Sequence, residues 1–315
     1  MTFEKAYCTE LDADVTAYKA RREFFAQEDD SLRYHFFCPD SECNVELVGV
    51  KIYSTSKLAM PPHFRTFPNR EHSKTCSIIK ELEVGDGSKD AKKNRAKNGN
   101  KTSKFVNEFI LQRPAKKSDN KGPSSNYDDE FDIEPRTKKH STPSEFKAGD
   151  KPIKTSYLEN VVDCYEAMDE EDRKKYTILL NGELRTYKNT FKNIKYFQDG
   201  TNFIFYGQIK PIKPYGKNFS IKFIDRAWID NKSYDIKIYI TEEIINQYRL
   251  KRLFNESMKQ LSSADKKLLT EHPPVCYFVG AYPTLKTVPL QESVKFDILE
   301  VNITNLDHLV IKFKE

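Results

Sequence analysis

The chain has 315 residues and a formal net charge of +5, with 31% charged and 38% hydrophobic residues. This composition is typical of a water-soluble protein with one large or two ordinary domains. No run approaches the roughly 18 apolar residues of a membrane span, and residues 1–15 carry acids rather than the apolar stretch of a secretory signal. We therefore expect a cytoplasmic protein without a membrane partner, whose mild positive charge permits nucleic-acid contact without requiring it.

Cysteine and histidine pairs dominate residues 1–80. Four residues separate Cys38 from Cys43, and three separate His72 from Cys76. Zinc takes about four nitrogen or sulfur ligands in a tetrahedron, which two short-range pairs can supply. The neighbours of these cysteines are turn formers and polar residues, and nothing indicates the oxidising compartment that disulfides need. We predict a small zinc-binding module over residues 1–80, with Cys38, Cys43, His72 and Cys76 as ligands.

The identity of the histidine ligand stays open at this point. His72 has the better spacing to Cys76, while His63 and His35 are alternatives. The remaining cysteines lack such neighbours, and we expect them to be buried as small apolar side chains. They are Cys8, Cys164 and Cys276.

Residues 81–155 differ abruptly in composition from the rest of the chain. They are rich in Lys, Asn, Ser, Gly, Asp and Pro and poor in aliphatic residues, which predicts a disordered, flexible linker. Within it, residues 88–121 hold eleven Lys or Arg against three Asp or Glu. Such a basic arm either raises nonspecific affinity for nucleic acid or serves only as a soluble tether. Residues 102–112 are an exception, for which we predict a short docking helix.

Regular structure is expected again over residues 156–315. Apolar residues from Leu158 to Met168 have helical spacing, with Thr155 or Ser156 as the N-cap, and residues 241–258 predict one amphipathic helix. Several short strands with one inserted helix predict a β-rich domain, either an OB-like barrel or a curled antiparallel sheet, so the fold class is α+β. The strand-like runs, rich in β-branched and aromatic residues, are 176–180, 202–209, 219–224, 234–240, 275–281, 294–301 and 308–313.

Basic and aromatic residues interleave in this C-terminal domain. Proteins that bind single strands combine a positive groove with aromatic rings on which bases stack. Most of the aromatic residues are expected in the core, but those in the turn KPYGKN are candidates for an exposed contact. A basic stretch on the predicted helix is a second candidate. The predicted nucleic-acid-binding residues are Lys213, Tyr215, Lys217, Arg249, Lys251 and Arg252.

The cysteine segment resembles the N-terminal zinc module of the competence-protein CoiA family. The resemblance covers about residues 33–78, which read CPDSEC, then PPHFRTFPNREHSKTC. It implies a zinc-binding module and a role in DNA transactions, while the rest of the chain resembles bacterial proteins of unassigned function. The positions that match are Cys38, Cys43, Pro62-His63-Phe64, His72 and Cys76.

CoiA-type proteins carry a nuclease domain after this module, and the present chain departs from them there. The nearest match to the acidic and lysine residues of such a site is Asp235-Ile-Lys237, with Asp225 or Asp230 before it. The simpler interpretation is a strand with outward charges, so we predict no catalytic residue.

These observations favour a zinc-containing accessory protein that binds nucleic acid, DNA rather than RNA. Its setting would be a bacterial DNA-uptake, mobile-element or phage-defence system. The first alternative is a protein-interaction adaptor that docks a partner enzyme. The second alternative is a divergent metal-dependent nuclease.

Overall fold

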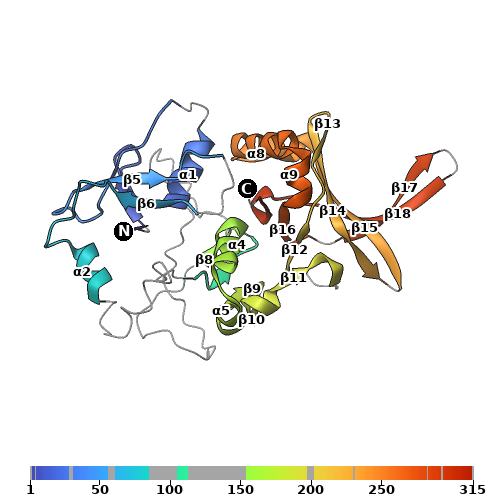
Figure 1. Ribbon diagram of the computed structural model, residues 1–315, viewed down its shortest axis with the longest axis horizontal. Coiled ribbons are helices and arrows are strands. Elements are labelled where there is room, and N and C mark those ends of the chain that lie inside the picture. The colour runs from blue at the N-terminus through green and yellow to red at the C-terminus, as the bar shows by residue number, and fades with distance from the viewer. Residues whose placement is uncertain are drawn as a thin grey trace, which may run out of the picture. The chain divides into compact units, whose positions relative to one another are not determined.

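The described part of the chain forms two units (Figure 1). The first unit comprises Met1–Ser103 and Arg249–Gln260, and the second comprises Lys104–Tyr248 and Leu261–Glu315. Both mix helices and strands, so the α+β class is confirmed. Most of the predicted linker, residues 81–155, lies outside the described residues. This computed structural model describes residues 2–3, 5–27, 31–55, 61–84, 105–112, 154–196, 202–229, 231–281, 283–291 and 294–313.

An antiparallel sheet forms the centre of the first unit. Its strand order is β1-β6-β5-β4-β2-β3. Helix α1 (Ala17–Ala26) follows β3 directly, because the side chain of Thr16 accepts a hydrogen bond from the Lys19 amide and caps the helix. The strands are β1 (Thr2–Phe3), β2 (Lys5–Cys8), β3 (Ala13–Thr16), β4 (Phe36–Phe37), β5 (Glu46–Val50) and β6 (His63–Thr66).

Helix α8 (Lys251–Ser263) contributes its residues up to Gln260 to the first unit. The Arg252 guanidinium lies 5.0 Å from the centre of the Phe24 ring and donates to the Phe24 carbonyl over 3.2 Å. Arg249, just before the helix, forms a 2.6 Å ion pair with Glu23. This segment, which was predicted to belong to the C-terminal domain, therefore packs on α1.

Two four-stranded sheets and helix α4 (Leu158–Ala167) enclose the main core of the second unit. Leu158, Ile178 and Tyr187 are fully buried there, and the Tyr187 hydroxyl donates to the Val106 carbonyl over 2.7 Å. The first sheet, in the order β10-β9-β7-β8, contains β7 (Glu108–Phe109), β8 (Lys154–Thr155), β9 (Thr177–Leu180) and β10 (Glu183–Thr186). The second, in the order β11-β12-β16-β19, contains β11 (Phe191–Asn193), β12 (Ile204–Gln208), β16 (Val275–Val279) and β19 (Leu309–Lys312).

A five-stranded sheet completes the second unit, and its long strands are the orange and red arrows of Figure 1. The order is β13-β14-β15-β18-β17, with β15 and β18 parallel and the other pairs antiparallel. Its strands are β13 (Lys213–Tyr215), β14 (Asn218–Ile229), β15 (Lys232–Ile240), β17 (Pro283–Gln291) and β18 (Val294–Val301). The remaining helices are α5 (Glu170–Lys175), α6 (Tyr187–Thr190), η1 (Ile194–Tyr196), α7 (Glu242–Gln247), α9 (Lys266–Glu271) and η2 (Leu306–His308).

The seven predicted strands of residues 156–315 all exist, but they do not form the predicted barrel. In the described ranges no sheet closes on itself, and the OB-like barrel is not confirmed. The parallel pairing of β15 with β18 also differs from a wholly antiparallel sheet. A parallel neighbour requires a crossover connection rather than a hairpin. Residues 241–281, with three helices and strand β16, supply much of that connection.

Three local predictions are corrected. Residues 105–112 contain strand β7 rather than a helix, because Glu108 and Phe109 pair with β8 and β9 and bury Phe109. The single helix over 241–258 is two helices, α7 and α8, separated where Tyr248 adopts extended backbone. Helix α4 has no side-chain cap, since Thr155 instead accepts a hydrogen bond from the Tyr157 amide.

In the described ranges no helix combines the length and apolar character required to cross a bilayer. The predicted burial of cysteines outside the metal motif holds, since Cys8 and Cys276 are buried and Cys164 packs against the main core.

Candidate functional site

Four metal-ligating side chains from the first unit converge in one place. They are Cys38, Cys43, His72 and Cys76, whose ligand atoms all lie within 4.8 Å of one another. The Cys38 and Cys76 sulfurs are 3.7 Å apart, and His72 Nδ1 lies 3.4 Å from the Cys43 sulfur and 3.6 Å from that of Cys76. All four can hold a metal ion.

The first cysteine pair is shaped by the turn after β4. The Cys43 amide donates to the Asp40 carbonyl over 3.0 Å, and the Cys38 amide donates to the Val45 carbonyl over 2.8 Å. Asn44 follows with a φ of 44°, a left-handed conformation that asparagine tolerates better than most residues. This backbone directs both thiols of the pair to the same side of the turn.

The second pair lies between β6 and helix α2 (Ser77–Val84). The Cys76 amide donates to the Ser73 carbonyl over 3.0 Å, and the Ser73 amide donates to the Cys43 sulfur over 3.3 Å. A hydrogen bond of this kind fixes the orientation of a ligating sulfur. The second loop therefore helps to position a side chain of the first pair.

Asp40 connects the two pairs. Its Oδ2 atom accepts hydrogen bonds from the Ser77 amide over 2.6 Å and from the Ser77 hydroxyl over 2.7 Å. These bonds lower the pKa of Asp40 to about 2. Because Ser77 begins α2, the carboxylate also satisfies an amide that the first helical turn leaves without a partner.

Burial shifts the pKa values of Cys38 and His72. Cys38 and Cys76 are only 3% and 1% exposed. Burial raises the pKa of the Cys38 thiol to about 12, and the adjacent Cys76 and Cys43 add to that rise. Burial also lowers the pKa of His72, which favours the neutral imidazole that binds metals. A bound cation reverses the balance for the thiols, because a coordinating thiol is deprotonated.

The structure distinguishes His72 from the two alternative histidines. His63 Nδ1 lies 3.0 Å from the Pro61 carbonyl, and His35 Nδ1 forms a 2.6 Å contact with Glu10. Neither belongs to the group of metal-ligating side chains. All three cysteines of the group are free thiols.

The predicted nucleic-acid-binding residues belong to both units. Lys213 and Tyr215 lie on β13 in the second unit, and Tyr215 is 75% exposed. Lys217 forms a 2.7 Å ion pair with Glu242. In the first unit Lys251 is exposed, whereas Arg249 and Arg252 make the contacts with α1 described above.

Strand register places Lys213 in a row with two further lysines. Lys213 on β13 lies opposite Ser220 on β14. Lys222 is two positions after Ser220, so its side chain is on the same face of β14. Lys222 is in turn opposite Lys237 on β15. The three lysines therefore belong to one face of the five-stranded sheet.

The same row continues to the far edge of the sheet. Lys237 lies opposite Glu300 on β18, and Glu300 lies opposite Thr284 on β17. Lys286 is two residues beyond Thr284 on that face, and its ammonium group contacts Glu300 at 2.9 Å. We call Lys213, Lys222, Lys237 and Lys286 the lysine face.

Lys222, Lys237 and Lys286 were not among the predicted nucleic-acid-binding residues. Alternation along each strand showed which residues face outward, but not which strands are neighbours. Asp235, the closest match to a nuclease carboxylate, forms a 2.9 Å ion pair with Arg226. Among the described residues, the three cysteines and His72 are the only group of three or more metal-ligating side chains.

Comparison of the chain with protein-family models, with curated proteins and with solved structures finds no match. The resemblance of residues 33–78 to the CoiA zinc module therefore stays a prediction.

Proposed function

We propose that this chain is a zinc-stabilised protein that binds nucleic acid through the lysine face. The observation that carries the proposal is the row of four lysines, from β13, β14, β15 and β17, with the exposed Tyr215 beside Lys213. Nucleic-acid backbones attract such surfaces through phosphate contacts and counterion release. The proposal keeps DNA as the favoured nucleic acid and a bacterial accessory role as the setting.

The donor set supports zinc as the metal. Three sulfurs and one nitrogen are typical of structural zinc sites. In a tetrahedron with zinc–sulfur bonds of about 2.3 Å and zinc–nitrogen bonds of about 2.0–2.1 Å, two sulfurs lie about 3.8 Å apart and a sulfur and a nitrogen about 3.6 Å apart. The short contacts of 3.7, 3.4 and 3.6 Å between these atoms are close to those edges. Four protein ligands leave no open position, which favours a structural role over catalysis.

The clustered positive charges of the lysine face favour an anionic binding partner. Partial burial and the charge of Lys222 lower the pKa of Lys237, while Glu300 acts in the opposite direction. In the described residues Lys286 is the only member of the lysine face with an ion-pair partner. A phosphate brought to this row would relieve repulsion between like charges, so its binding would be favoured.

Tyr215 supports binding to single strands in particular. Its ring is 75% exposed at the end of β13, opposite Asn218, on the same face as Ser220 and Lys222. Stacking of a base on an exposed aromatic ring contributes about 1–3 kcal/mol. Bases of a duplex are already stacked on one another, so this gain is larger for an unpaired strand.

The test is a fluorescence-anisotropy titration of the full chain with labelled single-stranded DNA, duplex DNA and RNA at several salt concentrations. We expect affinity to fall steeply with salt, and Lys222→Ala with Lys237→Ala to reduce the slope of log K against log salt by about 1.4 for a single strand. Tyr215→Ala should weaken single-strand binding by about 1–3 kcal/mol. Lys267→Ala, an exposed lysine on α9, is the matched control and should have no effect.

Two results would refute the proposal. Absence of binding to all three nucleic acids at low salt would favour the adaptor alternative. Binding with the same salt slope in the lysine-face variant and the Lys267→Ala control would place the contact elsewhere on the chain.

A further inference from the structure

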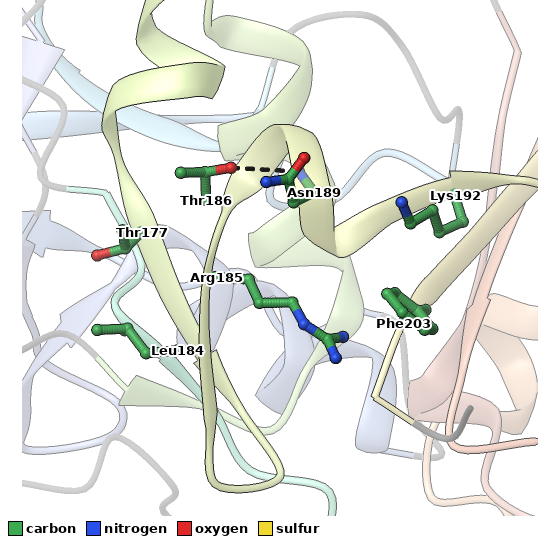
Figure 2. A pocket seen from close by; sticks show the side chains of 7 residues that line it. All are labelled: Thr177, Leu184, Arg185, Thr186, Asn189, Lys192 and Phe203. Atoms are coloured by element: carbon green, nitrogen blue, oxygen red, sulfur yellow. Dashed lines mark hydrogen bonds between the residues drawn. The ribbon is translucent and has the colours of Figure 1, made fainter.

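The second unit has a pocket of about 500 Å³ (Figure 2). No residue of the lysine face lines it. Its lining comes from β9, β10, α6 and β11, together with Phe203 just before β12. All of these elements border the main core of the unit, so the walls rest on buried residues such as Ile178 and Phe191. A pocket of this size suits a small organic ligand.

Two cationic side chains of the pocket, those of Arg185 and Lys192, both lie near the ring of Phe203. The Arg185 guanidinium lies 4.3 Å from the centre of the Phe203 ring, and the Lys192 ammonium lies 5.4 Å from it. Arg185 also donates to the Asn202 carbonyl over 2.9 Å and forms an ion pair with Glu183. These contacts hold the guanidinium in a fixed orientation, with both cations beside the same ring.

The remaining polar lining is neutral. Thr177, Thr186 and Asn189 line the pocket, and none of the described lining residues is acidic. Glu183 offsets one of the two positive charges, which leaves the pocket with a positive balance. Hydroxyl, amide, ammonium and guanidinium groups all donate hydrogen bonds, so the lining matches an acceptor-rich anion.

Part of the lining is apolar. Leu184 is 45% exposed. It lines the pocket together with Phe203, whose ring lies beside the Arg185 guanidinium in Figure 2. A simple anion gains nothing from contact with these apolar side chains, whereas a ligand with an aromatic ring can pack against them. The combination indicates an anionic group joined to a ring system.

We propose that this pocket binds a nucleotide, with Arg185, Lys192 and Asn189 holding a phosphate and with Leu184 and Phe203 contacting the base. The phosphate belongs either to a free mononucleotide or to the terminal nucleotide of a strand. The inference does not depend on the lysine face, because no lysine-face residue lines the pocket.

Calorimetric titration of the full, zinc-loaded chain with AMP tests the pocket. We expect AMP to bind at least tenfold more tightly than adenosine, since adenosine lacks the phosphate. Lys192→Ala should weaken AMP binding at least tenfold, while Lys192→Arg, which keeps the charge, should retain most of it. Lys267→Ala, which removes an exposed lysine outside the pocket, is the matched control and should leave the AMP affinity unchanged.

A second arm distinguishes the two sources of phosphate. If the ligand is the end of a strand, a 5′-phosphorylated oligonucleotide should bind more tightly than its unphosphorylated form, and Lys192→Ala should remove the difference. If the ligand is a free nucleotide, AMP binds without that preference. Asn189→Ala is a second variant at an exposed position and should weaken binding of the preferred ligand.

Three results would overturn the inference. The first is equal affinity for adenosine and AMP. The second is unchanged affinity in variants of both Lys192 and Asn189. The third is no AMP binding together with no preference for a phosphorylated end. None depends on whether long nucleic acids bind the lysine face, so the two proposals fail separately.

Discussion

At the scale of single residues, Gly207 on β12 illustrates how closely the second unit is packed. A Cβ atom at this position would lie 2.7 Å from Ile194 Cγ2 and 3.1 Å from the Phe223 ring. Both neighbours are buried, so neither can move aside freely. We expect Gly207→Ala to lower the free energy of unfolding by about 1–3 kcal/mol, measured by urea denaturation.

A double-mutant cycle shows whether this clash is the cause. Ile194→Ala removes the closest methyl group, so the double variant should lose less stability than the sum of the two single variants. Purely additive losses would mean that Gly207 is required for a reason other than its contact with Ile194.

Glu10 and His35 give the first unit a dependence on pH. The Glu10 carboxylate accepts bonds from the His35 amide at 2.8 Å and contacts its Nδ1 at 2.6 Å. Burial raises the pKa of Glu10, but the His35 bonds outweigh it and the pKa falls to about 2, while the same contact raises the pKa of His35. The Glu10 contribution is therefore present above about pH 4.5 and lost toward pH 2. The His35 contribution is present below about pH 6.5 and lost as pH rises through its folded pKa.

The stabilising contributions of Glu10 and His35 are both present between about pH 4.5 and 6.5. We expect Glu10→Gln to reduce the stability of the first unit most near pH 5.5, and less at pH 3 and pH 8.5, by urea denaturation at each pH. Asp14→Asn, an exposed acid on the adjacent strand β3, is the control. An equal loss at all three values would contradict a titrating pair.

The convergence of Cys38, Cys43, His72 and Cys76 is the feature of the candidate site that the sequence predicts best. Cys38 with Cys43, and His72 with Cys76, are close in the chain, so spacing alone groups each pair. The role of Asp40 was not predicted, because its partner Ser77 is 37 positions away and only the folded loop brings them together. The sequence thus predicts pairs of side chains that are close in the chain, but it does not predict contacts between distant segments.

At the scale of elements, Arg252 on α8 and Arg249 just before it both contact α1 within the first unit. Arg249 pairs with Glu23, and Arg252 lies over the rings of Phe24 and Phe25. We expect Arg252→Ala to destabilise the first unit by about 1–3 kcal/mol, because both a bond to a carbonyl and two ring contacts are lost. Thermal denaturation followed by tryptic cleavage of the N-terminal half would measure this loss.

The same variant tests the predicted role of this helix in nucleic-acid binding. The salt slope of strand binding should be unchanged in Arg252→Ala, as in the Lys267→Ala control. A slope reduced by about 1 with unchanged stability would instead assign Arg252 to a phosphate contact.

Strands were predicted better than helices for a physical reason. β9, β12, β14, β15, β16, β18 and β19 are rich in branched and aromatic residues, which suit a partly buried sheet. Strand β7 was mistaken for a helix because its two residues carry no pattern, and only pairing with β8 and β9 holds them extended. The break between α7 and α8 was missed because the apolar spacing continues across Tyr248, whose hydroxyl donates to Asp307.

At the scale of the whole molecule, the two units should differ in their dependence on metal. The first unit has short strands and a group of four side chains that can hold a metal ion, with two nearly buried cysteines, so we expect metal binding to contribute strongly to its folding. The second unit has its own core, built from α4 and two sheets. We expect one zinc per chain, and we expect Cys43→Ser to lose the metal and to unfold the first unit while the second stays folded.

Metal analysis and limited proteolysis together decide this prediction. Structural zinc contributes about 10–16 kcal/mol of binding free energy at pH 7, so its loss exceeds the stability of a small unit. New cleavage sites should appear within residues 31–84 and also within 249–260, because that helical segment belongs to the first unit. His63→Ala, which alters a histidine outside the ligand group, should keep both the metal and the protease resistance. Full zinc content in Cys43→Ser would show that the four side chains are not the ligand set, and intact resistance without zinc would show that the first unit folds without metal.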